Sequence, residues 1–337
     1  MSTLTSLGFA VIGAGRIGNL HAKHLAGAVD GARLVIVMDA DLDAAKRAAY
    51  GGAAATQEVA AALAHPEVEA VLIASPTNLH AEQIKLAAAA GKAIFCEKPV
   101  ALDLQETINA MRAVKAAGIP FQIGFNRRFD PGYAEVAKAV KAGAIGKVEL
   151  FRSQSSDPGP APEAYIAASG GFYRDSIIHD IDTARFVVGE IKRVTALGRV
   201  LIDPAYAKYG DVDTSILTIE FASGALGVLM NTRRTIYGYD LRVEVHGEKG
   251  KLLTEDERAT KVWRYDKDGI HGDFYYFFLE RFKDAYRIEL QAFVDAVRQG
   301  ETPSPGPEDA VESLRVADAA TRSLKEGRPV EVAEIKG

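Results

Sequence analysis

The sequence predicts an α/β protein in two parts: an N-terminal doubly wound parallel sheet, and a C-terminal α+β domain with an open, mostly antiparallel sheet. Three observations support this prediction. Strand-like runs alternate with helical segments over the first 125 residues, a glycine-rich turn follows the first of these runs, and β-type runs predominate from Lys147 onward. Alternating strands and helices are typical of parallel sheets, whereas consecutive strands joined by turns are typical of antiparallel sheets.

The first part contains short apolar runs, rich in branched residues, that we interpret as strands. They are Phe9–Ile12, Leu34–Met38, Ala70–Ala74, Ala93–Cys96 and Phe121–Ile123. Between them lie Ala-, Leu- and Lys-rich stretches of helical length, such as His80–Ala90 and Gln105–Ala117. Gly91 and Gly118 stand where these two helices should end, and Pro99 lies just past a strand end. Right-handed crossovers between such strands give a doubly wound sheet of the Rossmann type.

The second part is expected to be mainly β-structure with a few helices. Its strand-like runs are Val148–Arg152, Val194–Leu201, Ser215–Phe221, Ala225–Asn231, Arg242–His246 and Lys261–Tyr265. One helix is expected at Ser176–Val188, and two more close the chain at Arg287–Arg298 and Glu308–Leu324. We place the boundary near Asn126–Phe129, which assigns residues 1–127 to the first domain and 128–337 to the second.

Composition and charge exclude several classes of protein. The 337 residues are 48% hydrophobic and 25% charged, which is average for globular domains, and the formal net charge is −5 without a basic stripe, which argues against a nucleic-acid partner. No apolar run reaches the length of about 18 residues that a membrane span needs. The start, Met1–Leu7, lacks a basic region, so Phe9–Ile12 is interpreted as a strand rather than a signal peptide. The single cysteine, Cys96, fits a reducing cytoplasm.

The glycine-rich turn predicts a dinucleotide site. Gly13-Ala14-Gly15-Arg16-Ile17-Gly18 follows the first strand and opens a helix. In such a motif the first glycine allows a tight turn, the second lets pyrophosphate approach the backbone, and the third packs helix against strand. Asp39 ends the next strand, where a carboxylate accepts from the ribose 2′-hydroxyl and repels a 2′-phosphate. No basic residue follows Asp39, so the sequence favours NAD over NADP.

Two further loops are expected on the cofactor side of the sheet, because each follows the carboxyl end of a strand. Ser75-Pro76-Thr77-Asn78-Leu79-His80 follows Ala70–Ala74, and Glu97-Lys98-Pro99 follows Ala93–Cys96. We count Ser75, Thr77, Asn78, His80, Glu97 and Lys98 as cofactor-site candidates. A lysine held there could stabilise an alkoxide as hydride leaves, although an ordinary strand-end lysine fits the same position.

Asp175, His179 and Asp182 are candidate catalytic residues on the helix expected from Ser176. Spacings of four and three residues place them on one stripe. The opposite side carries the apolar residues Ile177, Ile178, Ile181, Ala184 and Val188. This stripe could be an ordinary polar face exposed to solvent. Alternatively, it could be a catalytic group in which the two carboxylates raise the basicity of His179. The residues alone leave both readings open.

No metal site is expected. His21 and His24 are three residues apart on the first helix, but no carboxylate or cysteine cluster completes a metal site, so packing or solvent contact is favoured over metal binding. Cys96 has no base near it in the sequence and is interpreted as a buried thiol.

With these residues in hand, the chain resembles the Gfo/Idh/MocA oxidoreductase family from end to end. The resemblance rests on the glycine loop Gly13–Gly18, on Glu97-Lys98-Pro99 and on the pair Asp175…His179. Within the family the chain is most similar to bacterial inositol 2-dehydrogenases. The segments similar to theirs are Gly124–Asp130, Ser156–Pro162, Arg233–Asp240 and Phe278–Phe282.

The resemblance implies a catalytic triad of Lys98, Asp175 and His179, with hydride passing from a ring carbon of inositol to NAD. It further implies that the remaining hydroxyls are contacted by Asn126, Arg127, Asp157, Asp182, Tyr237 and Tyr286. Some members of the family have methionine where this chain has Asn126, so the inositol isomer stays open. A homotetramer or homodimer is implied as well.

Competing functions follow from the same features. A dehydrogenase of the same family acting on an aldose or an anhydrosugar is the nearest alternative. A non-redox NAD-binding sensor and a hydrolase that uses NAD transiently come from other classes. A sensor has no need for Lys98, Asp175 and His179 together, and a hydrolase forms no net NADH.

Overall fold

The computed structural model describes residues 6–255 and 257–337, which divide into two compact units. The first unit contains the chain up to Asn126 together with Asp284–Glu312 and Gly337, and the second contains Arg127–Lys283 and Ser313–Lys336. The first five residues, which bear on the expected lack of a signal peptide, lie outside the described part of the chain.

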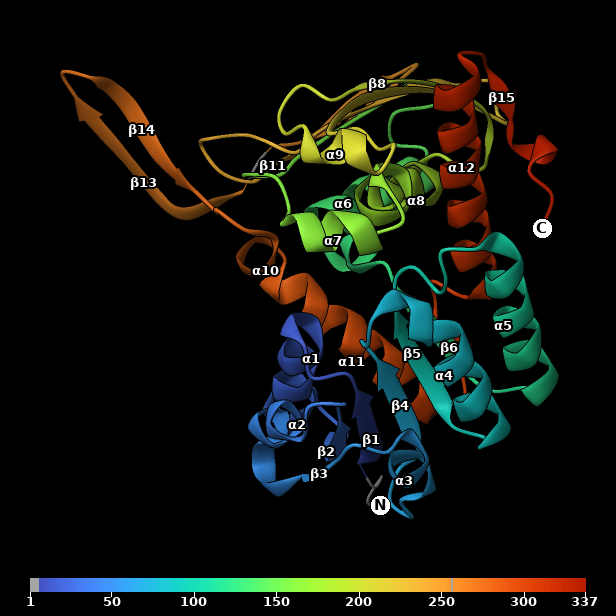
Figure 1. Cartoon of the computed structure of the whole chain (residues 1–337). Coiled ribbons are helices and arrows are strands. Elements are labelled where there is room, and N and C mark those ends of the chain that lie inside the picture. Colours follow the sequence, from blue (N-terminus) through green and yellow to red (C-terminus); the bar gives the residue numbers. More distant parts are fainter. Residues whose placement is uncertain (1–5, 256) are drawn as a thin grey trace. The chain divides into compact units, whose positions relative to one another are not determined.

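The first unit is built on a six-stranded parallel sheet with the order β3-β2-β1-β4-β5-β6 (Figure 1). The order reverses between β1 and β4, which is where doubly wound sheets bind their ligands. This confirms the predicted Rossmann-type sheet. Its strands are β1 (Leu7–Ile12), β2 (Ala32–Met38), β3 (Ala54–Thr56), β4 (Ala70–Ile73), β5 (Ala93–Glu97) and β6 (Phe121–Gly124). Its helices include α1 (Arg16–Gly27), α2 (Leu42–Ala48), α3 (Val59–Ala64), α4 (Thr77–Ala89) and α5 (Leu104–Ala117).

Local sequence explains most of these elements. All six residues of β1 are buried, as expected for a strand covered on both faces by crossover helices. The Asp103 side chain caps α5 by accepting from the Glu106 amide, and Gly118 ends the helix at φ 64°. Strand β3 was not predicted, because its three residues Ala54–Thr56 include two alanines and form too short a run to stand out.

Helix α11 (Lys283–Gln299) belongs to the first unit, whereas the sequence prediction placed it in the second domain. Its residues Leu290, Phe293 and Val294 are buried in the core that the parallel sheet forms. The Phe293 ring lies 6.0 Å from Phe9 and 5.9 Å from Phe95, both edge-on. The chain therefore leaves the first unit after Asn126 and re-enters it at Asp284. A single boundary near residue 127 does not account for this second segment.

The second unit has a seven-stranded sheet in the order β12-β11-β7-β10-β9-β8-β15. Only β7 and β10 pair in parallel; the other neighbouring strands among the described residues are antiparallel, as predicted. The strands are β7 (Val148–Ser156), β8 (Ile191–Arg199), β9 (Thr214–Phe221), β10 (Leu226–Thr232), β11 (Asp240–Gly247), β12 (Gly250–Thr254) and β15 (Val330–Glu331). A separate hairpin, β13 (Arg258–Asp266) and β14 (Gly269–Phe274), extends away from this sheet (Figure 1).

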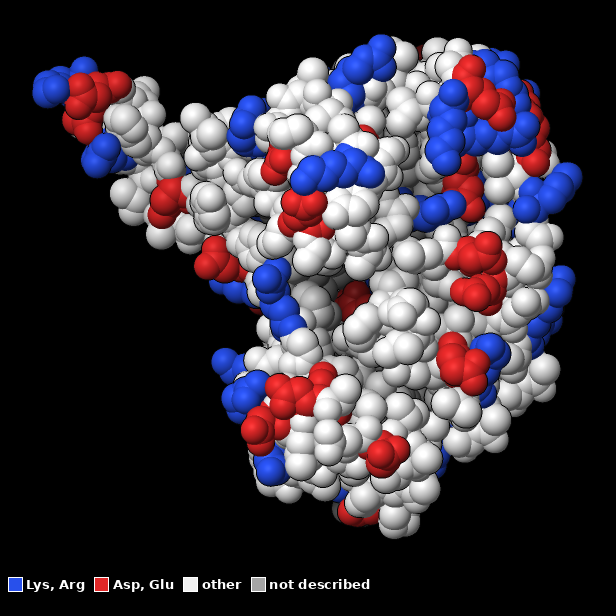
Figure 2. Space-filling model, in the orientation of Figure 1, with Lys and Arg blue, Asp and Glu red and all other residues white. Residues whose placement is uncertain are grey.

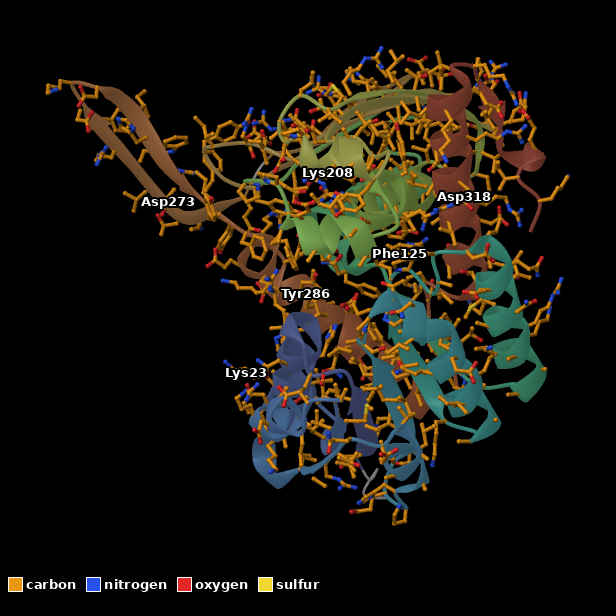
Figure 3. The ribbon with its side chains drawn as sticks, in the orientation of Figure 1. Lys23, Phe125, Lys208, Asp273, Tyr286 and Asp318 are labelled. Atoms are coloured by element: carbon orange, nitrogen blue, oxygen red, sulfur yellow. The ribbon has the colours of Figure 1, made fainter. Side chains whose placement is uncertain are left out.

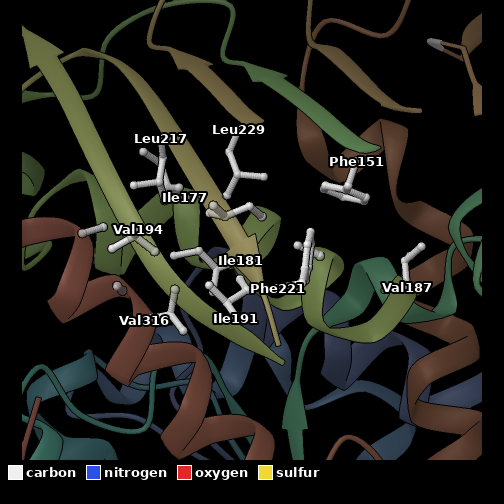
Figure 4. Close-up of a cluster of buried hydrophobic side chains, with 14 of the residues drawn as sticks. Phe151, Ile177, Ile181, Val187, Ile191, Val194, Leu217, Phe221, Leu229 and Val316 are labelled. Atoms are coloured by element: carbon white, nitrogen blue, oxygen red, sulfur yellow. The ribbon is translucent and has the colours of Figure 1, made fainter. Parts of the chain in front are cut away.

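Helices cover one face of the seven-stranded sheet. Ile177 and Ile181 pack there against Leu217, Phe221 and Leu229 of the sheet (Figure 4). The helices of the second unit are α6 (Pro131–Lys141), α7 (Glu163–Ala168), η3 (Tyr173–Ile177), α8 (Ile178–Val187), α9 (Ala205–Lys208) and α10 (Phe278–Arg281), and α12 (Pro307–Glu326) lies mostly within it. Helices α6, α7, α9 and α10 and strands β12, β14 and β15 were not predicted, since most are short.

The helix predicted at Ser176–Val188 begins earlier than expected. A π-helical turn, Tyr173–Ile177, precedes α8, so Asp175 lies inside the helical segment rather than before it. Such turns are frequent at functional sites. The predicted apolar side is confirmed at Ile177, Ile178, Ile181 and Ala184, but Val187 is buried where Val188 was expected.

The surface carries mixed charge. On the face that Figure 2 shows, Lys and Arg are interspersed with Asp and Glu. None of the described helices is both long enough and apolar enough to cross a membrane.

Candidate active site

The glycine loop has the geometry that a pyrophosphate site requires. Gly13 has φ 95°, and a Cβ there would lie 2.7 Å from the Ala74 carbonyl oxygen. A Cβ on Gly18 would lie 1.8 Å from the Gly13 carbonyl oxygen, so this third glycine lets α1 pack closely. Around Gly15 a Cβ would meet nothing within 4 Å, and no side chain caps the start of α1. The loop therefore fits an anion at the helix N-terminus.

Asp39 is held against this loop. Its Oδ2 atom accepts from the Ala14 amide over 2.6 Å, and its Oδ1 atom accepts from the Asp41 amide over 2.9 Å. Each carboxylate oxygen can accept a further hydrogen bond. The carboxylate is thus fixed beside the glycine loop, with capacity left for ribose hydroxyls.

His80 ties two of the predicted cofactor loops together. Its Nδ1 atom lies 2.9 Å from the Pro99 carbonyl oxygen, and its Nε2 atom lies 2.7 Å from the Ser75 carbonyl oxygen. Burial lowers the pKa of His80, and the two carbonyl contacts oppose that shift. With 2% exposure, His80 suits a positioning role better than direct contact with a cofactor. Thr77 is half-buried and Asn78 exposed at the start of α4.

Glu97 and Lys98 stand at the carboxyl end of β5 as predicted. The Glu97 Oε1 atom lies 2.7 Å from His21 Nε2. Cys96 is buried, which confirms the expected buried thiol, and burial together with the Glu97 charge raises its thiol pKa well above the usual value.

The sequence showed no carboxylate cluster beside His21, but the structure has one, while the expected lack of a metal site stays a prediction. Glu97 and Glu289 each place an atom within 4.8 Å of the His21 ring and of each other. Both residues lie far from His21 in the sequence, and the fold brings them together. His24 is different, because burial lowers its pKa to about 4. The nearby His21 is the second largest cause and lowers the pKa further.

In the second unit, Asp175 is part of a charged network. Its Oδ2 atom accepts from Arg233 Nη2 over 2.7 Å, and its Oδ1 atom accepts from the Tyr165 hydroxyl over 2.7 Å. Arg233 also donates from Nη1 to Asp157 Oδ2 over 2.8 Å. The Arg233 guanidinium lies 4.5 Å from the centroid of the Phe172 ring. Two predicted site carboxylates, Asp157 and Asp175, therefore share one cation.

The pKa shifts in this network have opposing causes. Burial acts against the charge of Arg233, but Asp175 and Asp157 outweigh burial and raise the pKa of the guanidinium. Burial raises the pKa of Asp157, and Arg233 opposes that rise. Burial and then the Asp175 charge raise the pKa of the Tyr165 hydroxyl, so Tyr165 remains a donor.

Arg127 and Asp182, both predicted to contact substrate, are engaged with other protein groups. Arg127 Nη1 donates to Asp180 Oδ1 and to Ser155 Oγ, each over 2.9 Å. Asp182 accepts from Arg128 through both oxygens, over 2.9 and 2.7 Å. Asp182 is 1% exposed, and Asp175 is buried too, so the stripe on this helix is not a solvated polar face.

The other predicted substrate residues lie in different settings. Asn126 is buried at the start of η2 (Asn126–Phe129). The Tyr237 hydroxyl donates to Asp240 Oδ2 over 2.8 Å, and its side chain is exposed. Tyr286 lies on α11 (Figure 3), and its ring lies 5.7 Å from His21 within the first unit. His179 is half-buried, and its carbonyl accepts from the Thr183 hydroxyl over 2.7 Å.

Sequence reasoning missed several residues that hold these groups in place. Arg233 was named only within Arg233–Asp240, a segment similar to those of inositol 2-dehydrogenases. Tyr165, Arg128 and Asp180 were not predicted as site residues. Asp180 is fully buried and accepts from Asn231 as well as from Arg127. An unpaired buried carboxylate is costly, so a predicted core helix carrying Asp180 was a signal that cations must lie opposite it.

Together, the Rossmann sheet, its NAD-type glycine loop and the mixed-sheet second unit define the class: a two-unit, NAD-binding oxidoreductase. Family models agree with this. "Oxidoreductase family, NAD-binding Rossmann fold" matches residues 7–125, and "Oxidoreductase family, C-terminal alpha/beta domain" matches residues 137–332. The chain belongs to the Gfo/Idh/MocA oxidoreductase family.

Similar proteins cover nearly the whole chain. Myo-inositol 2-dehydrogenase of Thermotoga maritima is 42% identical over 97% of this chain and 99% of its own. The scyllo-inositol 2-dehydrogenase (NAD(+)) of Bacillus subtilis is 40% identical over 96% of this chain and 95% of its own. A crystal structure of scyllo-inositol dehydrogenase from Lactobacillus casei with bound NAD(H) and scyllo-inositol is 28% identical, with a TM-score of 0.91, over 98% of this chain and 100% of that one.

Proposed function

We propose that this protein is an NAD-dependent inositol 2-dehydrogenase, which oxidises one ring hydroxyl of myo- or scyllo-inositol to the ketone. One observation carries the proposal. The residues that bear the chemistry, Lys98, Asp175 and His179, are all present in a chain that aligns over nearly its full length with dehydrogenases named for both isomers.

NAD supplies a hydride acceptor when it is bound. Asp39 would accept from the ribose 2′-hydroxyl, since its carboxylate is already fixed beside the glycine loop. The residues Gly13, Gly15, Arg16, Ile17 and Gly18 would hold the pyrophosphate on the α1 N-terminus. We propose further cofactor contacts from the two loops that His80 positions. They are Ser75, Thr77, Asn78 and Glu97.

In the proposed reaction the substrate hydroxyl gives its proton to His179, and the ring carbon that bears this hydroxyl gives a hydride to NAD. Lys98 stabilises the alkoxide as it forms. Asp175 supports the protonated imidazole of His179. Arg233 and Tyr165 both donate to the Asp175 carboxylate, so they hold it in one orientation.

The proposed contacts to the other hydroxyls are Asn126, Arg127, Asp157, Asp182, Tyr237 and Tyr286. The side chain of Asp157 is 24% exposed, which makes it well suited to direct contact. Arg127 and Asp182 are bonded within the protein and more deeply buried. We propose that these two residues have two roles: they hold the neighbouring backbone in place, and they contact the substrate.

NADH formation tests the proposed function. Absorbance is followed with NAD and a panel of inositols, aldoses and anhydrosugars. Turnover of an inositol at the highest kcat/KM supports the proposal, whereas a higher value for an aldose or anhydrosugar assigns the chain to the alternative substrate class. Deoxy analogues should be about 5- to 150-fold poorer in kcat/KM, since each leaves a buried polar group unpaired at about 1–3 kcal/mol. Absence of NADH with every substrate would favour the sensor or the hydrolase.

We also propose a homotetramer or homodimer in the cytoplasm. The face of the seven-stranded sheet opposite the helices carries exposed apolar side chains, and Leu150 lies beside Leu226 there, as Leu197 lies beside Ile216. An exposed apolar patch of this kind favours an interface. Light scattering measures the subunit number, and Leu226→Glu should lower it if this face is the interface. The single, buried Cys96 suits a reducing compartment.

A further inference from the structure

Three ionisable side chains meet in the apolar core of the first unit. They are His21 of α1, Glu97 at the end of β5, and Glu289 of α11, with one nitrogen or oxygen atom of each within 4.8 Å of the others. His21 and Glu289 are 0% exposed, and the Glu97 side chain is 13% exposed. The rings of Phe95 and Tyr286 lie edge-on to His21, at 5.5 and 5.7 Å.

Glu289 is the unusual member of this cluster. Neither of its carboxylate oxygens has a hydrogen-bond partner among the described residues. Its backbone carbonyl accepts from Gln122 Nε2, but that bond leaves the carboxyl group without a donor. An ionised carboxylate in this position is strongly disfavoured, because burial removes its hydration and no cation replaces it. A neutral carboxylic acid avoids that cost.

The charges around the cluster point the same way. Burial first, and then the Glu97 charge, raise the pKa of Glu289 well above its usual value. His24 lies near His21 on α1, but burial lowers its pKa to about 4, so it is neutral at physiological pH. Arg287 and Asp284 of α11 act on His24 with opposite signs. Among the described residues, the charge that acts on the Glu289 carboxyl is that of Glu97, and it favours the protonated form.

A proton fits this cluster better than a metal ion does. His21 Nε2 lies 2.7 Å from a Glu97 oxygen. When Glu97 is ionised its carboxylate can only accept, so this nitrogen then carries hydrogen and offers no lone pair to a metal. A cation would then have to bind through His21 Nδ1 and the two carboxylates, in a cluster where the His21 and Glu289 side chains are fully buried.

The cluster reaches the cofactor edge of the sheet through Glu97. This residue closes β5 directly before Lys98, and it is the member with exposed surface. The nicotinamide ring is positively charged in NAD+ and neutral in NADH, so the two forms place different charges near that edge. A positive charge there stabilises the ionised carboxyl groups and favours loss of a proton.

We propose that His21, Glu97 and Glu289 form a buried proton-binding site that holds its proton in the free protein and in the NADH complex and releases it, through Glu97, when NAD+ binds. The proton moves from a carboxyl oxygen to solvent, and no other bond changes. The proposal rests on NAD as the cofactor of the proposed function, but it does not depend on the substrate.

Calorimetry of cofactor binding tests the proposal on the full-length protein without substrate. NAD+ and NADH are titrated in buffers of differing ionisation enthalpy, which gives the number of protons released. NAD+ should release up to one proton per subunit, and NADH none. The affinity for NAD+ should then rise by up to tenfold per pH unit, the dependence expected for release of one proton.

Glu289→Gln replaces the carboxylic acid by a neutral group of the same shape. This variant should bind NAD+ without releasing a proton and without the pH dependence. Asp295→Asn, which removes a half-buried carboxylate from the same helix, should keep both.

The outcomes separate the two proposals. NAD+ binding without proton release in the wild type overturns the proton site and leaves the dehydrogenase in place. Proton release that persists in Glu289→Gln also overturns it, as does one zinc or manganese ion per subunit in the purified protein. Proton release with NAD+ in a protein that oxidises no inositol would support the proton site and contradict the substrate assignment.

Discussion

Arg233 donates from its Nη2 atom to the Oδ2 atom of Asp175 over 2.7 Å. Both side chains are 9% exposed, so water screens this pair little. The same guanidinium also donates to Asp157. Asp175, the proposed partner of His179, is therefore held by a cation that lies 58 positions away in the sequence, and its electrostatic setting depends on that cation.

The first prediction concerns this ion pair. Arg233→Met leaves the buried carboxylate of Asp175 and the half-buried carboxylate of Asp157 without this cation, which should lower the free energy of unfolding by about 3–5 kcal/mol. Activity should fall on the order of 10²-fold, because Asp175 loses its fixed orientation. Urea unfolding and steady-state kinetics measure the two effects.

Two further variants control the Arg233 result. Arg193→Met removes a half-exposed arginine that pairs with Glu220 in the same unit, and it should cost at most about 1 kcal/mol. Arg233→Lys keeps the charge but not the two-pronged geometry, so it should recover part of the stability and less of the activity. Full activity in Arg233→Met would show that Asp175 does not need this cation.

The second prediction concerns cofactor choice. Asp39→Ser removes the acceptor for the 2′-hydroxyl and the repulsion of a 2′-phosphate. The Kd of NAD should rise by about 5- to 150-fold, corresponding to about 1–3 kcal/mol, while NADP binding improves. Asp43→Ser, an exposed change in α2, should alter neither. A wild type that already prefers NADP would contradict the assigned role of Asp39.

The parts of the cofactor half that could be predicted depend on residues close together in the chain. The roles of Gly13 and Gly18 follow from a turn of six residues, and the structure shows both at positions where a Cβ would clash. Asp39 was predicted to be a cofactor-site residue because it ends a strand. Its hydrogen bond to the Ala14 amide places it beside the glycine loop, in agreement with that prediction. Local pattern and strand order suffice for such a site.

The rest of the site depends on contacts between distant segments. Asp175 and His179 were found from helical spacing, but their stripe could not be distinguished from a solvated face, because Arg233 and Tyr165 approach it from other elements. His21 and Glu289 are brought together only because α11 returns to the first unit. No spacing rule connects positions so far apart.

The third prediction concerns the proposed general base. His179→Ala should lower turnover by about 10²–10⁴-fold, the usual contribution of such a group, while the Kd of NAD stays unchanged. The wild type should also lose turnover at acid pH as the imidazole takes up a proton, and the alanine variant should not show that loss. Stopped assays over a pH series, together with calorimetry for NAD, measure these effects.

A matched histidine variant controls this measurement. His246→Ala changes a histidine of β11 that pairs with Glu244, and its turnover should match the wild type. Turnover retained in His179→Ala would remove His179 from the proposed mechanism.

The last prediction follows from the buried acid Glu289. Burial and the Glu97 charge raise its pKa in the folded chain well above the usual value, whereas the unfolded chain has an ordinary glutamate pKa of about 4.3. Between these two values the folded chain binds one proton more than the unfolded chain. The contribution of Glu289 to stability is therefore lost as pH rises, by about 1.4 kcal/mol per pH unit from about pH 5 upward.

Glu289→Gln has no proton to lose, so the variant should gain stability relative to the wild type as pH rises. Urea unfolding of both proteins from pH 5 to pH 8 measures this difference, and the comparison cancels the other titrating groups. Asp295→Asn should give a difference that does not change with pH in this window. A Glu289→Gln variant that is less stable than the wild type by the same amount at every pH would show that Glu289 is ionised and paired with a cation.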